Sequence, residues 1–189
     1  TDEWITTRTG IKTRHITDSS TATSDLALEA CRRAMEDAGW APGDVQAIIM
    51  ATVTPDHAFP ATACLVANRL GLPRVPAWDF EAGCSGFVYG MIQARAFIEA
   101  GLFDRILVVG AECLTKITNW KDRASCVLFG DGAGAAAVSS QGPGGLLGGF
   151  HWGSDGAISD LLVQQAGGSR MPATRETVDA GLHCIAMNG

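Results

Sequence analysis

The sequence predicts an α/β fold class with a largely parallel sheet. Two nearly continuous apolar runs, Val45 to Thr52 and Arg105 to Gly110, are typical of parallel strands that are buried on both faces. Segments with apolar residues at helical spacing lie between such runs, and glycines come directly after their ends. Strands that alternate with helices in this way favour a parallel sheet covered by helices.

The elements can be assigned in chain order. The first helix is expected at Thr21 to Ala38, with Ser24 as its N-cap residue and Gly39 at the C′ position. The elements expected next are the strand Val45 to Thr52, the helix Ala61 to Leu70, the strand Val75 to Phe80, the helix Ser85 to Ala100 and the strand Arg105 to Gly110.

The pattern changes beyond the strand that ends at Gly110. Strands are expected at Ala124 to Phe129 and Ala133 to Ser139, with a further one at Leu146 to Trp152, so the sheet should finish in antiparallel hairpins. The run Gly130 to Gly134 lies between the first two. It is interpreted as a tight turn rather than a nucleotide-binding loop, because its spacing is not Gly-x-Gly-x-x-Gly and a strand comes after it.

Composition narrows the classes of function. The 189 residues are 47% hydrophobic and 18% charged, and the formal net charge is -6. An acidic chain without a basic block is not expected to bind nucleic acid. No apolar run is long enough to span a bilayer and no signal peptide opens the chain, so we expect a soluble protein without a membrane partner.

Cysteine usage favours a cytoplasmic location. No pair is spaced as Cys-x-x-Cys and no matching histidine pair exists, so no metal site is expected. Scattered cysteines in apolar surroundings suit a reducing cytosol better than a secreted disulfide scaffold. The six cysteines are Cys31, Cys64, Cys84, Cys113, Cys126 and Cys184.

Cys84 is the strongest candidate for chemistry. It lies in Gly83-Cys84-Ser85-Gly86, between an expected strand and the next helix. Unpaired N–H groups and the positive end of the helix dipole favour a thiolate at such a corner, and the flanking glycines allow another molecule to approach closely. The alternative is a small buried cysteine in a tight corner, and these residues alone support both interpretations about equally.

Two other clusters could bind a ligand. Trp4 and Arg8 are one helical turn apart and could stack a base and hold a phosphate. Lys121-Asp122-Arg123 offers a second basic site in an expected loop. Taken alone, the Trp–Arg pair is more typical of side chains that pack on their own chain. Each of the four histidines is likewise more typical of a surface or packing residue.

Several segments occur in an order and spacing that is highly specific as a set. They are Asp2-Glu3-Trp4-Ile5, Arg8-Thr9-Gly10-Ile11, Arg14-His15-Ile16, His57-Ala58-Phe59-Pro60, Ala82-Gly83-Cys84-Ser85-Gly86-Phe87, Asp122-Arg123 and Phe129-Gly130-Asp131-Gly132-Ala133-Gly134-Ala135. Together they resemble the 3-oxoacyl-[acyl-carrier-protein] synthase III family, and the resemblance runs from Thr1 to about Gly189.

The resemblance implies a thiolase-type fold, in which two similar α/β halves pack into five layers and two chains form a homodimer. It also implies a reaction. Cys84 would take the acyl group of a short acyl-CoA, normally acetyl-CoA, into a covalent thioester. Malonyl-acyl-carrier-protein would then lose carbon dioxide. Its carbanion would attack the acyl-cysteine to give a 3-oxoacyl product, which initiates fatty acid biosynthesis.

The resemblance also implies roles for other residues. Trp4 and Arg123 would sandwich the adenine of coenzyme A, and Arg8 would help to hold its phosphates. Phe59 would lie near the dimer interface and close the acyl pocket of the neighbouring chain. Gly130 to Gly134 would be a structural turn under the active site. The coenzyme A thioester would be a substrate, so no permanently bound cofactor is expected, and the acyl carrier protein would be a partner.

The chain is expected to form most of the N-terminal half of that fold, as one domain over residues 1–189 that carries the nucleophilic cysteine. The family's first strand and its second half are expected to lie outside it. That second half supplies a catalytic histidine and asparagine, and neither His183 nor Asn188 matches this pair. We therefore expect residues 1–189 alone to be catalytically incomplete.

Three alternatives stay open beside a synthase of fatty acid biosynthesis. One is a related priming synthase of polyketide or other secondary metabolism, since the motifs specify the chemistry better than the acyl group. A second is a half that binds coenzyme A or a partner chain without turnover. A cysteine-dependent hydrolase is the weakest alternative, because no local general base accompanies Cys84.

Overall fold

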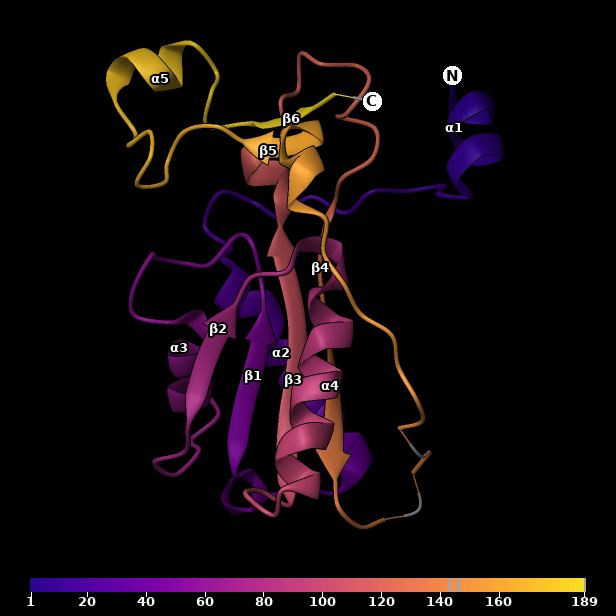
Figure 1. Cartoon of the computed structure of the whole chain (residues 1–189), viewed down its shortest axis with the longest axis vertical. Helices are drawn as coiled ribbons and strands as arrows, with labels where there is room; N and C mark the ends of the chain where they lie inside the picture. The colour runs from indigo at the N-terminus through magenta and orange to yellow at the C-terminus, as the bar shows by residue number, and fades with distance from the viewer. Residues whose placement is uncertain (143, 146, 189) are drawn as a thin grey trace. The chain divides into compact units, whose positions relative to one another are not determined.

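The computed structural model describes residues 1–142, 144–145 and 147–188 (Figure 1). The chain divides into two compact units. The four-stranded unit consists of Asp18–Glu112 and Gly132–Trp152, and the small-sheet unit consists of Thr1–Thr17, Cys113–Asp131 and Gly153–Gly189.

A mixed sheet in the order β2-β1-β3-β4 forms the centre of the four-stranded unit. β1 pairs in parallel with both of its neighbours, so that Ile48 lies opposite Ala77 on one side and Leu107 on the other. β4 runs antiparallel to β3 (Figure 1), because the N–H of Ser140 at its end donates to the carbonyl of Asp104 at the start of β3, 2.9 Å away. The strands are β1 (Ala47–Ala51), β2 (Ala77–Phe80), β3 (Arg105–Cys113) and β4 (Asp131–Ser139).

Alternate residues of β1 and β3 pack against helices on opposite faces of the sheet. On one face, Ile48 and Met50 lie in a buried cluster with residues of α2 (Thr23–Ala38) and α3 (Thr62–Arg69). On the other face, Ile49 and Val108 pack against α4 (Gly86–Glu99). These strands are therefore buried on both faces, as their continuous apolar runs predict, and the predicted α/β class with a largely parallel sheet is confirmed.

The helices predicted in this unit all form, within two residues of the expected bounds. Gly39 and Gly101 come after their helices with positive φ angles of 67° and 70°, which glycine adopts without steric strain. The predicted N-cap residue is wrong. Ala22 precedes α2 as its N-cap, and Ser24 lies inside the first turn, where its N–H donates to Asp56 at 2.9 Å.

The strand predicted at Ala124 to Phe129 is wrong. The segment forms consecutive turns, because the carboxylate of Asp122 accepts hydrogen bonds from the N–H of Ala124 and the hydroxyl of Ser125. The N–H of Cys126 donates back to the carbonyl of Asp122 at 3.0 Å. A polar side chain at the start of the segment therefore draws the backbone into local bonds that compete with a strand.

The turn predicted at Gly130 to Gly134 is also wrong, since β4 begins at Asp131 and continues through Gly134. None of the three glycines in the run has a positive φ angle, so the backbone is extended there. The N–H of Asp131 donates to the carbonyl of His15 at 2.8 Å, which fixes the start of the strand.

The strand predicted at Leu146 to Trp152 is not observed over residues 147–152, and Leu146 lies outside the described residues. Side chains of α4 hold this segment instead of a backbone ladder. Arg95 donates to the carbonyl of Gly148 and lies over the ring of Phe150, 5.4 Å from its centroid. Tyr89 packs edge-on against Trp152 with ring centroids 5.1 Å apart.

The small-sheet unit contains short elements. β5 and β6 pair antiparallel, with Leu162 opposite Met187, although about 20 residues separate them in the chain. Neither strand was expected from the sequence. The elements described are α1 (Asp2–Thr9), η3 (Leu114–Ile117), η4 (Gly156–Leu161), β5 (Leu162–Gln164), α5 (Arg175–Asp179) and β6 (Ile185–Met187).

Asp131 ties together separate segments of the small-sheet unit. Its carboxylate accepts the N–H and hydroxyl of Thr17 and the N–H and hydroxyl of Thr115, at 2.6–2.8 Å. Burial acts to raise the pKa of Asp131, but these four hydrogen bonds outweigh burial and bring the pKa below its ordinary value of 3.8.

We expect Asp131→Asn to lower the free energy of unfolding by about 2 kcal/mol at pH 7, because an amide NH2 would face groups that already donate. The folded-state pKa of Asp131 is depressed, so its stabilisation is present above pH 3.8 and is lost as pH falls through the folded-state value. Urea unfolding at neutral and acidic pH measures both effects. The exposed Asp160→Asn should change neither, and a deficit of Asp131→Asn that persists in acid would contradict this explanation.

Candidate functional site

Cys84 is exposed at the carboxyl edge of the parallel strands, in the four-stranded unit. β2 ends at Phe80, and a 3-10 turn, η2 (Gly83–Ser85), leads directly into α4. Gly83 has a φ of 52°, a left-handed conformation that explains the glycine before the cysteine. The predicted strand-to-helix corner is therefore confirmed, with Cys84 in the 3-10 turn that precedes the α-helix.

Close packing of α4 on the sheet fixes the position of this corner. A Cβ atom added to Gly86 would lie 2.7 Å from the Cβ of Ala51 in β1. A Cβ atom added to Gly90, one turn later, would lie 2.8 Å from Cγ1 of Val108 in β3. Only glycine allows these approaches, so the helix can pack on the sheet at one distance only. Cys84, two residues before the helix, is held in place with it.

A pocket of about 370 Å³ is lined in part by Asp79, Phe80 and Glu81, the residues that lead to the cysteine corner. One wall is the segment 53–61, which comes after β1, and the other is the end of β2, which runs on to Cys84. Asp79 in that wall accepts the N–H groups of Thr62 and Ala63 at 2.5 and 2.7 Å, so its carboxylate caps α3. The lining residues are Thr52, Val53, Pro55, His57, Ala58, Ala61, Asp79, Phe80 and Glu81.

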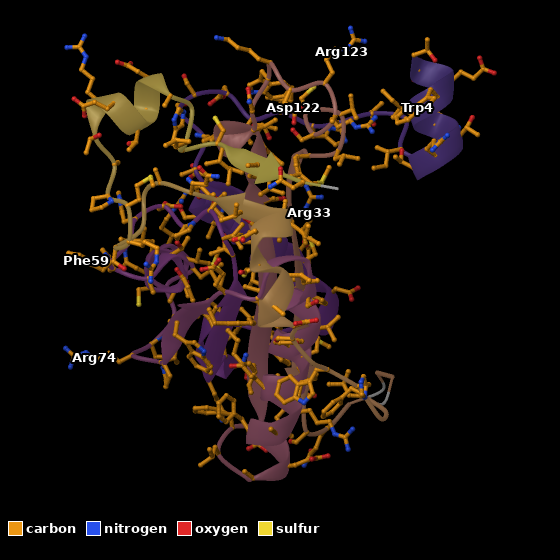
Figure 2. All side chains as sticks on the ribbon, turned by 45° about the horizontal axis from the view of Figure 1, so that its top comes forward. Trp4, Arg33, Phe59, Arg74, Asp122 and Arg123 are labelled. Carbon is orange, nitrogen blue, oxygen red and sulfur yellow. The ribbon has the colours of Figure 1, made fainter. Side chains whose placement is uncertain are left out.

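The other predicted site residues are exposed. Phe59 is 85% exposed in segment 53–61, and the aromatic ring extends from the ribbon in Figure 2. Trp4 and Arg8 lie on α1 of the small-sheet unit, where the Arg8 guanidinium carbon is 5.1 Å from the ring centroid of Trp4. The two side chains thus pack on each other, which agrees with the interpretation that the pair packs on its own chain rather than on a base. Arg123 is exposed in the same unit, and its position relative to coenzyme A stays a prediction.

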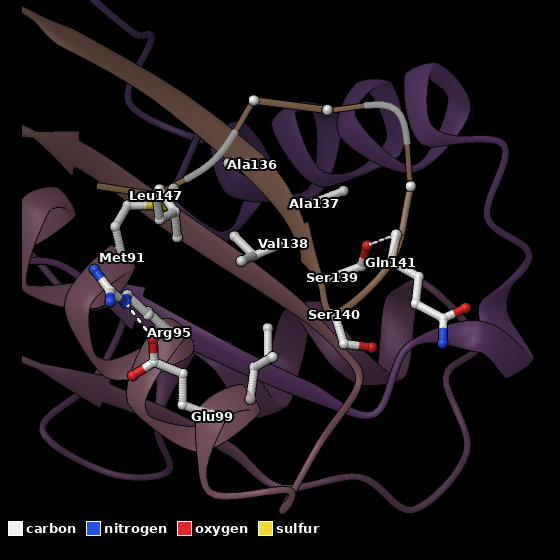
Figure 3. Close-up of a pocket in the computed structure, with 14 residues that line it drawn as sticks. Met91, Arg95, Glu99, Ala136, Ala137, Val138, Ser139, Ser140, Gln141 and Leu147 are labelled. Carbon is white, nitrogen blue, oxygen red and sulfur yellow. Dashed lines mark hydrogen bonds and ion pairs between the residues drawn. The ribbon is translucent and has the colours of Figure 1, made fainter. Parts of the chain in front are cut away.

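A larger pocket of about 460 Å³ lies between α4 and β4 (Figure 3). Met91, Arg95 and Glu99 line it from the helix, and Arg95 pairs with Glu99 at 2.6 Å. Ala136 to Val138 of β4 line the facing side. None of the predicted site residues lines this pocket.

Sequence reasoning missed Glu112 at the end of β3. The carboxylate accepts the N–H of Val53 and the hydroxyl of Thr54 at 2.8 and 2.5 Å. Burial raises the pKa of Glu112, against the opposing effect of these donors. No sequence signal joins a glutamate to partners about 60 residues away, because the parallel pairing of β1 and β3 alone brings them together.

Metal and membrane sites can be assessed over residues 1–142, 144–145 and 147–188. Within them, no three His, Cys, Asp or Glu side chains gather closely enough to hold a metal ion. No helix in this part of the chain has the length and apolarity needed to cross a membrane.

Comparison with known proteins agrees with the resemblance seen in the sequence. Residues 78–156, which include the Cys84 corner, match the family model described as 3-Oxoacyl-[acyl-carrier-protein (ACP)] synthase III. The whole chain aligns at 57% identity with the beta-ketoacyl-[acyl-carrier-protein] synthase III of Caldanaerobacter subterraneus subsp. tengcongensis, over 57% of that protein. The resemblance to the synthase III family is confirmed.

Solved structures of synthases match the same fold. A crystal structure of a 3-oxoacyl-(acyl-carrier-protein) synthase III is 33% identical, covers 99% of this chain and 59% of its own, and superposes with a TM-score of 0.90. The priming beta-ketosynthase of the R1128 polyketide biosynthetic pathway is 30% identical over the whole chain and 55% of its own, with a TM-score of 0.81. The thiolase-like fold class is therefore confirmed, and the chain spans a little more than half the length of these synthases.

Proposed function

We propose that this chain carries the nucleophile of an acyl-CoA-primed condensing acyltransferase, a beta-ketoacyl-[acyl-carrier-protein] synthase III that initiates fatty acid biosynthesis. The exposed Cys84 at a strand-to-helix corner, within the segment that matches the family model, carries this proposal. A thiolate attacks thioesters well, and its own thioester remains reactive toward a carbon nucleophile.

The first half-reaction loads the enzyme. The Cys84 thiolate adds to the carbonyl carbon of acetyl-CoA or another short acyl-CoA, and the tetrahedral intermediate expels the coenzyme A thiolate, which takes up a proton. The backbone N–H of Cys84 supplies one donor to the oxyanion that develops, and the amino end of α4 favours negative charge beside it. The product is an acyl-cysteine thioester.

The second half-reaction forms the carbon–carbon bond. Malonyl-acyl-carrier-protein loses carbon dioxide, and the resulting enolate attacks the acyl-cysteine carbonyl. The Cys84 thiolate leaves, and the 3-oxoacyl group remains on the carrier protein. The enolate needs oxyanion donors in addition to the corner of Cys84, and neither His183 nor Asn188 is assigned to that role.

The remaining roles are part of the same proposal. Trp4 and Arg123 sandwich the adenine of coenzyme A, Arg8 helps to hold its phosphates, and Phe59 closes the acyl pocket of the second chain in a homodimer. All four side chains are exposed, and Arg8 has to turn from the ring of Trp4 toward the phosphates to take this role. We place this reaction in the cytoplasm, because scattered cysteines in apolar surroundings suit a reducing compartment.

Mass spectrometry of the protein expressed from its complete gene tests the function. After incubation with acetyl-CoA, we expect one acetyl group, which peptide mapping places on Cys84. Malonyl-acyl-carrier-protein should then remove the acetyl group and yield 3-oxoacyl-acyl-carrier-protein. An unmodified Cys84 would reject the synthase. Acetylation without any condensation product would instead favour a half that binds acyl-CoA without turnover.

A priming synthase of polyketide biosynthesis is the second candidate, supported by the 30% identity to the R1128 priming ketosynthase. Both candidates share the Cys84 chemistry and differ in the carrier protein that receives the acyl group after loading. Extension by the host's fatty acid carrier protein supports the first candidate, and extension only by a dedicated polyketide carrier protein supports the second.

Replacement of Trp4 or Arg123 by Ala should weaken the affinity for coenzyme A about tenfold, because each removes one face of the adenine site. Isothermal titration calorimetry with coenzyme A measures the dissociation constants. Arg74→Ala is a matched control, since Arg74 is an exposed arginine in the four-stranded unit (Figure 2). Equal affinities for Trp4→Ala, Arg123→Ala and Arg74→Ala would reject the adenine sandwich.

A further inference from the structure

Glu112 connects the carboxyl ends of two neighbouring strands. Oε1 accepts the N–H of Val53 at 2.8 Å, and Oε2 accepts the hydroxyl of Thr54 at 2.5 Å. The hydroxyl of Thr52 lies 3.4 Å from the same Oε2. All three donors belong to the three residues directly after β1, so one carboxylate near the end of β3 fixes the start of segment 53–61.

The same segment is anchored to two helices. The carbonyl of Thr54 accepts the hydroxyl of Thr23 at 2.5 Å. The carboxylate of Asp56 accepts the N–H of Ser24 at 2.9 Å, and the N–H of Asp56 donates to the hydroxyl of Thr62 at 3.1 Å. Segment 53–61 is therefore fixed at its start, whereas Phe59 near its other end is 85% exposed.

This anchoring determines one wall of the pocket of about 370 Å³. Val53, Pro55 and His57 line that wall, and the facing wall is the end of β2 that continues to Cys84. A shift of segment 53–61 therefore changes the pocket and the direction of Phe59 together. Burial of the Glu112 carboxylate is unfavourable by itself, so this carboxylate in turn requires the donors on segment 53–61.

We propose that Glu112 is a positioning residue that sets acyl-chain selectivity by fixing segment 53–61, and with it Phe59. This inference rests on the proposed function, in which Phe59 closes the acyl pocket of the neighbouring chain. Glu112 itself does not touch the acyl group. It acts by holding the backbone of Val53 and the hydroxyl of Thr54, so that a short acyl group is accepted and a longer one is excluded.

The test compares acyl-CoA substrates of two lengths in the protein expressed from its complete gene. Rates of Cys84 acylation by acetyl-CoA and hexanoyl-CoA give kcat/KM for each substrate. We expect Glu112→Ala to lower the acetyl-to-hexanoyl ratio about tenfold, because a loosened wall admits the longer chain. Glu112→Gln should lie between Glu112→Ala and the wild type, since its amide oxygen can still accept the N–H of Val53.

Val66→Ala is the matched control for lost stability. Val66 is fully buried on α3, and its truncation should lower the melting temperature without changing the acetyl-to-hexanoyl ratio. An unchanged ratio in both Glu112 variants, or an equal change in Val66→Ala, overturns the inference. Should Glu112→Ala not fold, the Glu112→Gln ratio decides. A wild-type protein whose Cys84 takes neither acyl group rejects the proposed function itself, which is a different result.

Discussion

Cys84→Ala is expected to abolish acylation by acetyl-CoA while the protein keeps its fold. The thiol is the only group removed, and no other group at this corner can form the thioester. Because Cys84 is exposed, the free energy of unfolding should change by no more than about 0.5 kcal/mol. Intact-protein mass spectrometry and urea unfolding of the same sample measure the two quantities together.

Cys64→Ala is the control for cysteine reactivity. Cys64 is also exposed, on α3, and is absent from every role proposed for the site. Its replacement should leave the acetyl label in place and at the same stoichiometry. A label that persists in Cys84→Ala and disappears in Cys64→Ala would move the nucleophile to α3 and refute the proposed mechanism.

The parallel core could be predicted because its strands are buried on both faces. Such burial requires the continuous apolar runs that β1 and β3 show, and the sequence displays them directly. The Cys84 corner could be predicted for a similar reason. Gly83 adopts a positive φ angle, and Gly86 allows a close contact between helix and strand. Both positions require glycine, and the sequence shows these glycines on either side of the cysteine.

The incorrect and missed predictions share a different physical cause. They depend on contacts that leave no local pattern in the sequence. The strand expected at Ala124 to Phe129 is replaced by turns that the Asp122 carboxylate organises. β5 and β6 pair although each has only three residues, too few for a period-2 pattern. Glu112 is bound to segment 53–61 only through the register of the sheet. Hydrophobic periodicity carries no information on such contacts.

Gly86→Ala is expected to have the second-largest effect, on both stability and acylation. The new Cβ atom would lie 2.7 Å from the Cβ of Ala51, closer than real Cβ contacts, in a strand that is buried throughout. Helix α4 must move away from β1, at a cost of about 2 kcal/mol. Because Cys84 lies two residues before Gly86, its acylation rate should fall at least about tenfold as the corner shifts.

Gly43→Ala is the control for the loss of a glycine, since a Cβ atom there meets nothing within 4 Å. It should change neither the free energy of unfolding nor acylation. Equal stability of Gly86→Ala and Gly43→Ala would mean that α4 is not held at a single depth.

A double variant tests whether the clash with Ala51 causes the effects of Gly86→Ala. Ala51→Gly removes the atom that the new methyl group would meet, at a cost of about 1 kcal/mol for glycine within a strand. If the close approach of α4 to β1 fixes the corner, the double variant should be more stable than the sum of the single effects predicts. It should also recover most of the acylation rate. Recovered stability without recovered acylation would show that the depth of α4 does not position Cys84.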